Sequence, residues 1–309
     1  MNKDTTTSIR GIMAIMIVLS HLGEYYHRVG SFFTPWGGYI GVSAFYFFSG
    51  YNLAYCKKNK KNYIDGFLEK KLIRVFLPGY IMYILYMFVI NRGFDIATIY
   101  KCGYLNNDCF FYWYVKSIVY IYLIFFIVYK LFEKYNIENN TLFGIIVWII
   151  TIIMNSFFVP TWLDYIVPVG FIFGWMMAIY GKKIEKYLNN SVMILLESCA
   201  LIVLITVACL SELSVFVVLF RFLACIIIAL LCFSISTRFI FSCIFKKIGM
   251  ISYEIYLVHP VLIRLCEAMS VGKVIYVLVV CIGTIFLAYI LLKMTLHVMN
   301  KCILDKKKD

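Results

Sequence analysis

Apolar residues along this chain gather in long runs that short polar segments interrupt. A helix needs about 20 mainly apolar residues to cross a bilayer. By this criterion the pattern predicts about ten membrane-spanning helices, at residues 9–26, 38–55, 73–90, 112–132, 142–158, 163–180, 192–210, 213–235, 248–268 and 274–298. The region 142–180 is broken by "VPTW" and forms either two full spans or one re-entrant hairpin.

Composition supports a membrane protein, because 63% of the residues are apolar and 15% are charged. Soluble domains have about 45–50% apolar and about 25% charged residues. We therefore expect an all-α polytopic protein with about ten transmembrane helices in one bundle, as a multi-pass protein of the cell membrane. Residues 1–309 are expected to form a single transmembrane domain, because the longest external loop, about 91–111, is too short to fold alone. The first apolar run is followed by others, which is not the pattern of a removable signal peptide.

The net charge of +13 is spread over short basic clusters between the apolar runs. With the N-terminus inside, the expected cytoplasmic segments hold 22 of the 29 lysines and arginines, and the external loops hold six. Basic residues concentrate on the cytoplasmic side of membrane proteins, so we predict that both termini are cytoplasmic. The clusters do not form a soluble basic domain for nucleic acid, and the "DKKKD" tail is expected to meet anionic membrane lipid.

Most of the eleven cysteines lie inside apolar runs, where a free thiol behaves as a small apolar group. The sequence has no pair of CxxC motifs, so no metal site is predicted. Cys102 and Cys109 share one expected external loop, where they either form a disulfide or remain free.

The first predicted span contains two ionisable residues, Arg10 and His21. Eleven residues make about three helical turns, so both side chains lie on nearly the same face, about 16 Å apart along the axis. Ionisable groups inside a membrane helix usually have a function. The alternative is a structural one, in which the arginine reaches the interface and the histidine bonds within the bundle.

Glu24 follows His21 by three residues and strengthens the functional interpretation. A carboxylate one turn away can hold one imidazole nitrogen and leave the other basic, as a general base requires. Alternatively, Glu24 only marks the water interface.

An arginine, ten residues and a histidine in the first span resemble the membrane-bound acyltransferase-3 family. Further stretches are similar to this family in the same order. They are "GVSAFYFFSGYNLAY" (41–55), "FLEKKLIRVFLPGY" (67–80), a weaker "FFYWYVKSIVYIY" (110–122) and "IGMISYEIYLVHPVLI" (248–263).

This resemblance implies a membrane-bound O-acyltransferase that takes an acyl group, usually acetyl, from cytoplasmic acyl-CoA. The acceptor would be a hydroxyl of an extracytoplasmic glycan or a similar molecule. His21 and Arg10 match the essential histidine and arginine of the family. The paired arginines of its third helix fall on Lys71 and Arg74, and a lysine at the first position lacks the bidentate fork for phosphate. Acetyl-CoA is expected as a donor substrate, with no permanently bound cofactor.

The basic segment 57–74 is a candidate contact for the phosphates of CoA. Its lysines and Arg74 lie on the expected cytoplasmic side and would attract a polyanion. Such clusters also occur as ordinary cytoplasmic loops that only set the orientation of the helices.

Three residues are candidates for acceptor binding or for orienting the histidine. Trp113 is either a substrate contact or an interfacial aromatic residue. Tyr253 offers a hydroxyl, although nothing in the sequence proves an oxyanion site. His259 either binds the acceptor or orients His21, or else forms a structural hydrogen bond.

Two further observations concern packing and the alternative function. Glu197 and Arg221 lie in neighbouring spans and could form a buried ion pair. A polytopic bundle with a few buried charges also describes a transporter or flippase of a small polar or glycan-linked substrate. The sequence has no detectable internal repeat, which favours the enzyme over the transporter.

Overall fold

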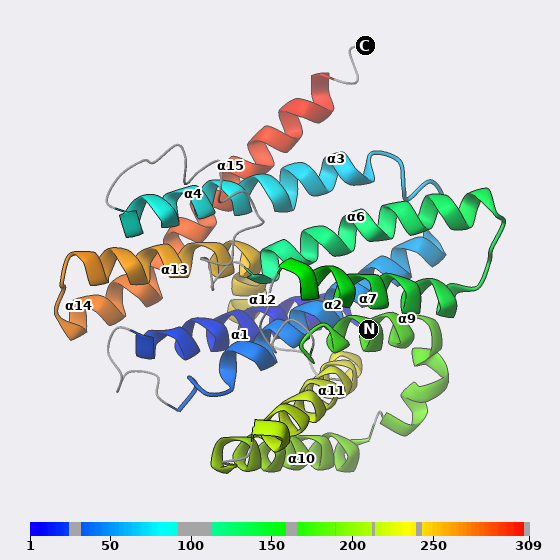
Figure 1. Ribbon diagram of the computed structural model, residues 1–309, viewed down its shortest axis with the longest axis horizontal. Helices are drawn as coiled ribbons and strands as arrows, with labels where there is room; N and C mark the ends of the chain where they lie inside the picture. The colour runs from blue at the N-terminus through cyan, green and yellow to red at the C-terminus, as the bar shows by residue number, and fades with distance from the viewer. Residues whose placement is uncertain are drawn as a thin grey trace.

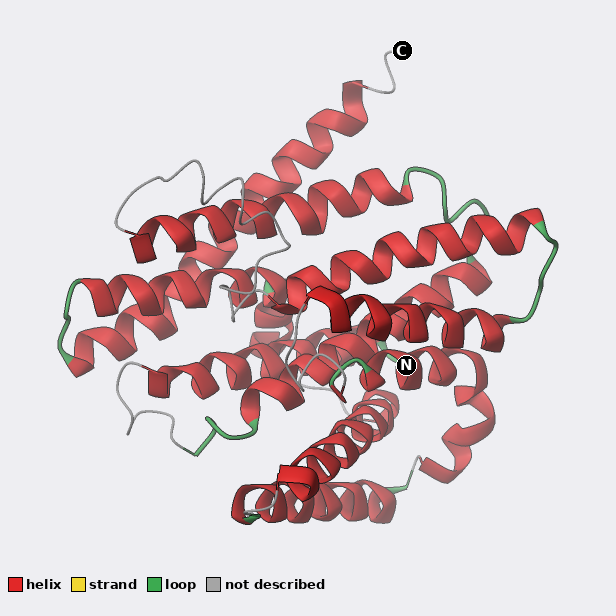
Figure 2. Ribbon diagram, in the orientation of Figure 1, coloured by secondary structure: helices red, strands yellow, loops and turns green. Residues whose placement is uncertain are grey.

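The computed structural model describes residues 1–24, 32–91, 113–158, 166–188, 190–211, 214–238 and 243–305. Within these ranges every regular element is helical (Figure 1, Figure 2). The tail after residue 305 and the loop that holds Cys102 and Cys109 lie outside the described residues, so their predicted contacts stay predictions.

Consecutive long helices run in alternating directions through the bundle (Figure 1). The described elements are α1 Lys3–His21, η1 Leu22–Glu24, α2 Gly37–Asn59, α3 Phe67–Lys71, η2 Leu72–Phe76, α4 Leu77–Asn91, α6 Trp113–Lys134, α7 Asn140–Phe158, α9 Val169–Leu188, α10 Ser191–Leu210, α11 Ser214–Arg238, α12 Cys243–Met250, α13 Ser252–Ala268, α14 Lys273–Leu278, η4 Val279–Gly283 and α15 Thr284–Asp305.

Each predicted span overlaps one of these helices or a run of consecutive elements. Six helices in the described part of the chain are long and apolar enough to cross a membrane, or seven if the bent pair α12–α13 is one span. The two parts of that pair meet at an angle of 70°. The number of ten spans therefore goes beyond what length and composition support, and the orientation of the termini stays a prediction.

The long helices that fail this test, α1, α2 and α9, pack into the interior of the bundle. The peripheral α10 is the opposite case, because only 11% of its apolar window is buried in the protein. A helix that faces other helices does not need an apolar surface all round, so interior helices can carry polar residues. A hydropathy test consequently fails to identify these interior helices as membrane spans.

Small residues bring α2 and α9 into close contact. Gly170 and Gly174 lie one turn apart on α9 and face the backbone carbonyls of Ser43 and Phe47 on α2. A Cβ atom at either glycine would collide with these carbonyls. This spacing of small residues is typical of closely packed membrane helices.

A second close contact joins α1 to α12. Gly249 faces the carbonyl of Thr7, and Gly11 faces the backbone of Gly249 in return. The two backbones can approach only because neither position has a side chain. This contact places the Arg10 region of α1 beside the start of α13.

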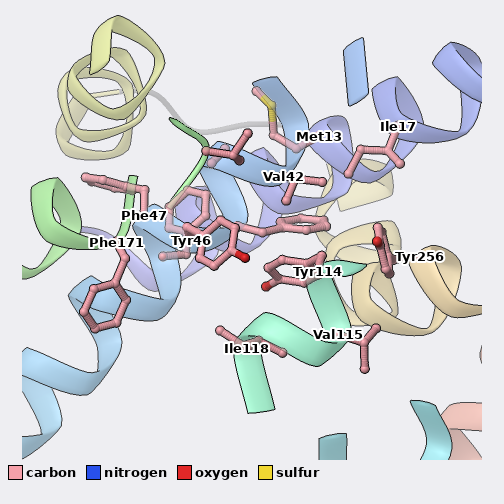
Figure 3. Close-up of a cluster of buried hydrophobic side chains, with 14 of the residues drawn as sticks. Met13, Ile17, Val42, Tyr46, Phe47, Tyr114, Val115, Ile118, Phe171 and Tyr256 are labelled. Atoms are coloured by element: carbon pink, nitrogen blue, oxygen red, sulfur yellow. The ribbon is translucent and has the colours of Figure 1, made fainter. Parts of the chain in front are cut away.

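Large aromatic side chains fill the space between α1, α2, α6, α9 and α13 (Figure 3). Tyr46 lies edge-to-face against Tyr114, with ring centroids 5.0 Å apart. Tyr114 also contacts Tyr256 of α13, at 5.3 Å. Aromatic pairs in this geometry stabilise a core beyond the area that they bury.

Candidate active site

A cavity of about 260 Å³ opens where the first half of α1, the second half of α2, η2, α6 and the start of α13 meet. Four of the residues predicted from the sequence line it: Arg10, Lys71, Arg74 and Tyr253. The other lining residues are Phe45, Phe48, Ser49, Asn52, Leu53, Tyr63, Val75, Tyr114, Ile118, Tyr122, Gly249, Met250, Ser252 and Glu254. The fold thus brings three cationic side chains from two separate segments to one cavity.

Arg10 reaches the cavity from the middle of α1. Its Nη2 donates to the Thr7 hydroxyl oxygen, 3.3 Å away, one turn earlier on the same helix. Thr7 itself donates to the carbonyl of Lys3, at 2.8 Å. These bonds use one of the five N–H donors of the guanidinium and leave others for a ligand.

Arg74 forms an ion pair with Glu254, with Nη1 and Oε1 2.8 Å apart. The carboxylate is fully buried, whereas the Arg74 side chain keeps 30% of its surface exposed. Next to this pair, the hydroxyl of Tyr253 donates to the carbonyl of Val75, at 2.7 Å. Two neighbouring residues of α13 therefore hold the segment that carries Arg74.

That segment, η2, is a π-helical turn within the continuous helix from α3 to α4. Wider turns of this kind leave backbone groups without their usual helical partners and are frequent at functional sites. Here the Val75 carbonyl accepts the Tyr253 hydroxyl proton. Tyr253 was expected to contribute its hydroxyl to acceptor binding or to orienting the histidine, and in the structure this hydroxyl donates to the backbone.

Lys71 lies on the edge of the cavity, with Nζ 4.0 Å from the centre of the Tyr122 ring and 5.5 Å from that of Phe67. Cation–π contacts of this length favour a fixed position of the ammonium group. Lys57, by contrast, donates to Asn140 at 2.6 Å and lies 4.7 Å from the Phe143 ring, away from the cavity. The basic residues of the segment 57–74 are thus divided, and of these only Lys71 and Arg74 line the cavity.

Tyr63 closes the cavity from the turn between α2 and α3. Burial raises the pKa of its hydroxyl, so the group stays protonated over the physiological range. It therefore adds a neutral hydrogen-bonding group to a cavity whose charges come from the helices.

His21 lies at the other end of α1, about 16 Å along the helix from Arg10. Its ring stacks on that of His259, with centroids 5.3 Å apart and planes at 30°. His259 is fully buried, and its Nδ1 lies 3.1 Å from the carbonyl of Ile255. The sequence placed both histidines at a similar depth, and the fold brings them into contact.

The backbone around His21 is fixed by two neighbouring elements. The Tyr276 hydroxyl donates to the carbonyl of Leu22, at 2.9 Å. The start of α2 packs against the end of α1, so that a Cβ atom at Gly38 would lie 3.9 Å from Nε2 of His21. A fixed backbone restricts where the imidazole can point, which a catalytic base requires.

Two tyrosines lie between the cavity and the histidine pair. Tyr114 lines the cavity and contacts Tyr256, which lies 5.8 Å from the ring of His259 (Figure 3). Both tyrosines are buried. These two rings therefore connect the lining of the cavity to the histidine pair.

Two further predicted residues, Trp113 and Glu24, lie at the ends of helical elements. Trp113 begins α6 and packs 6.5 Å from the rings of Tyr46 and Tyr114, outside the cavity. Glu24 ends η1, but its side chain lies outside the described part of the structure, so its bond to His21 stays a prediction.

The buried pair suggested for Glu197 and Arg221 was wrong. Glu197 accepts a hydrogen bond from Ser234, at 3.1 Å, and Arg221 lies over the Tyr39 ring, 5.5 Å from its centre. Both residues lie where the sequence placed them, on adjacent helices, but each points to a different neighbour.

Sequence reasoning missed Glu254 as a member of the site. A carboxylate in a predicted span was a signal in itself, because buried acids in membranes are usually paired. Its partner Arg74 is 180 residues away in the sequence, so the pairing needed the fold.

No group of three or more histidine, cysteine or acidic residues that could hold a metal ion occurs among the described residues. The cysteines that the structure describes are free thiols.

Residues 7–293 match the family model Acyl_transf_3, described as an acyltransferase domain. The match covers all the residues of the cavity and both histidines, and it confirms the resemblance seen in the sequence motifs. No curated protein and no solved structure matches the chain.

Proposed function

The chain belongs to the acyltransferase-3 family of membrane proteins, and we propose that it transfers an acetyl or similar acyl group from cytoplasmic acyl-CoA to a hydroxyl of an extracytoplasmic glycan. Membership of the family supports acyl transfer to a hydroxyl acceptor in general, and the transporter or flippase has no comparable support. The donor, the acyl group and the acceptor are the proposed part.

The cationic cavity is the observation that carries the proposal. Arg10, Lys71 and Arg74 converge on a space of about 260 Å³ that also has apolar walls. Cations gathered in a partly enclosed site attract phosphates more strongly than the same cations on an open surface. The phosphates and the apolar arm of CoA match these two kinds of lining.

His21 is proposed as the general base. Its imidazole takes the proton of the acceptor hydroxyl while the oxygen attacks the thioester carbonyl. The new C–O bond forms, the C–S bond breaks, and the departing sulfur of CoA receives the proton back from His21. His259 would keep the ring of His21 in position through the stacked contact.

Aromatic rings next to His21 support a glycan as the acceptor. Phe32, Phe33 and Trp36 precede α2, and their ring centroids lie 5.2–5.5 Å apart. Phe32 keeps 72% of its surface exposed. An exposed aromatic face is apolar and flat, so it suits the C–H face of a sugar ring.

The proposal is tested with membranes that contain the protein and acetyl-CoA labelled in the acetyl group. Label should enter surface carbohydrate with the wild-type protein and not with the His21→Ala variant at equal protein abundance. Equal labelling with both proteins, or no label in any hydroxyl acceptor, would contradict the proposal.

A further inference from the structure

We propose that Glu254 acts as an internal counter-anion of the cavity, and that its charge weakens the binding of the CoA phosphates. This inference rests on the proposed function, because it assumes that CoA occupies the cavity. It assigns Glu254 a role in how tightly the donor is held and how quickly free CoA leaves, and no role in the chemical step.

The geometry places the carboxylate among the cations that would hold a phosphate. Glu254 lines the same cavity as Arg10, Lys71 and Arg74, and its side chain is fully buried. Arg74 lines the cavity next to Glu254, with Nη1 2.8 Å from Oε1, and its side chain keeps 30% of its surface exposed. A phosphate that approached Arg74 would therefore lie within a few ångströms of a buried negative charge.

Charges in such a partly enclosed site interact more strongly than in bulk water, because the protein around them has a lower effective dielectric constant. The carboxylate stabilises the three cations while the cavity is empty. It repels a phosphate when one enters. The net effect is a site that attracts the donor without holding the released CoA too tightly, which a turnover cycle needs.

The position of Arg74 does not require the negative charge. The side-chain oxygen of a glutamine can accept a hydrogen bond from the nearby guanidinium, and the adjacent Tyr253–Val75 hydrogen bond holds α13 against η2 independently. The variant Glu254→Gln should thus keep the shape of the site and remove only the charge. Arg74 also has further N–H groups for a phosphate oxygen while it bonds residue 254.

The test compares CoA binding to the purified full-length protein in lipid nanodiscs, for the wild type and for Glu254→Gln. We expect Glu254→Gln to bind CoA and adenosine 3′,5′-diphosphate with a Kd about tenfold lower, mainly through slower dissociation. Pantetheine, which lacks the phosphates, should bind both proteins equally. Weaker or unchanged CoA binding by Glu254→Gln, or an equal change for pantetheine, would overturn the inference.

Two matched variants make the comparison specific. Glu69→Gln removes a carboxylate from the neighbouring α3, but Glu69 does not line the cavity, so its Kd for CoA should change little. If Glu254→Gln does not fold, Arg74→Gln is compared with the double variant Arg74→Gln/Glu254→Gln. Replacing both partners avoids an unpaired buried charge. The double variant should bind CoA more tightly than Arg74→Gln alone, and weaker binding would overturn the inference.

The same measurement separates this inference from the proposed function. A wild-type protein that binds no CoA would overturn both. A wild-type protein that binds CoA through Arg74, with a Glu254→Gln variant that binds it no better, would overturn the inference alone.

Discussion

The role of His259 follows from its contact with His21. The sequence offered acceptor binding, orientation of His21 or a structural hydrogen bond as its role. The structure shows a stacked contact with His21 and a close approach of Nδ1 to the Ile255 carbonyl. These contacts favour a positioning residue, because the ring is fixed by its own helix and supports the ring of His21.

The effect of a substitution at His259 on activity should therefore depend on whether the new residue keeps a flat ring. We expect His259→Ala to lower kcat by about tenfold, a fraction of what a general base contributes, with the KM of the donor unchanged. His259→Phe keeps a ring against His21 and should retain most of the activity. Steady-state kinetics, with CoA binding as the check on folding, would show the difference. A His259→Phe variant as inactive as a His21 variant would instead give His259 a direct chemical role.

Among the helices, the π-helical turn η2 and the bend between α12 and α13 are the features that the sequence did not predict. The apolar runs located the long helices of the described part of the chain. The same signal is blind to a wider turn or a bend of 70°, since neither changes the apolar content. Arg74 lies in the first of these irregular segments and Glu254 directly after the second, so neither their ion pair nor the shape of the cavity could be predicted from spacing.

The contact between α1 and α12 is expected to be intolerant of even a methyl group. A Cβ atom at Gly249 would collide with the carbonyl of Thr7, which is backbone and cannot turn away. We expect Gly249→Ala to destabilise the protein by about 1–3 kcal/mol, as other overpacked sites do. Thermal unfolding in detergent measures the effect. Gly272→Ala is the control, because nothing lies within 4 Å of its Cβ position. Equal melting temperatures for the two variants would contradict the tight packing of α1 on α12.

In the whole molecule, the interior helices are more polar than the lipid-facing helices. The interior α1, α2 and α9 carry the polar and small residues, whereas α10 and other outer helices are apolar towards the surroundings. The class of protein can be predicted from the apolar outer helices, and the family from motifs that lie partly on the inner ones. It could not count the crossings reliably, because an inner helix reads as less apolar than a membrane span.

The predicted orientation can be tested on single-cysteine variants in a cysteine-free background. A reagent that cannot cross the membrane should label positions 106 and 270 from outside the cell, and position 58 only after permeabilisation. We expect these positions on opposite sides because the basic residues concentrate near residue 58. Labelling of position 58 in intact cells would reverse the orientation and move the expected donor cavity to the outer side.

Arg10 and His21 have different proposed roles on the same helix, α1, and the most direct measurement separates these roles. Arg10 lines the cavity, and His21 lies about 16 Å further along the helix, outside it. Glutamine at position 21 can form hydrogen bonds but cannot carry a proton at neutral pH. Acetyl transfer from acetyl-CoA to carbohydrate is measured for the wild type and for His21→Gln, together with the Kd for CoA. We predict a loss of about 10²–10⁴-fold in the rate of transfer and an unchanged Kd. A His21→Gln protein that transfers acetyl groups at the wild-type rate would contradict the assignment of His21 as the base.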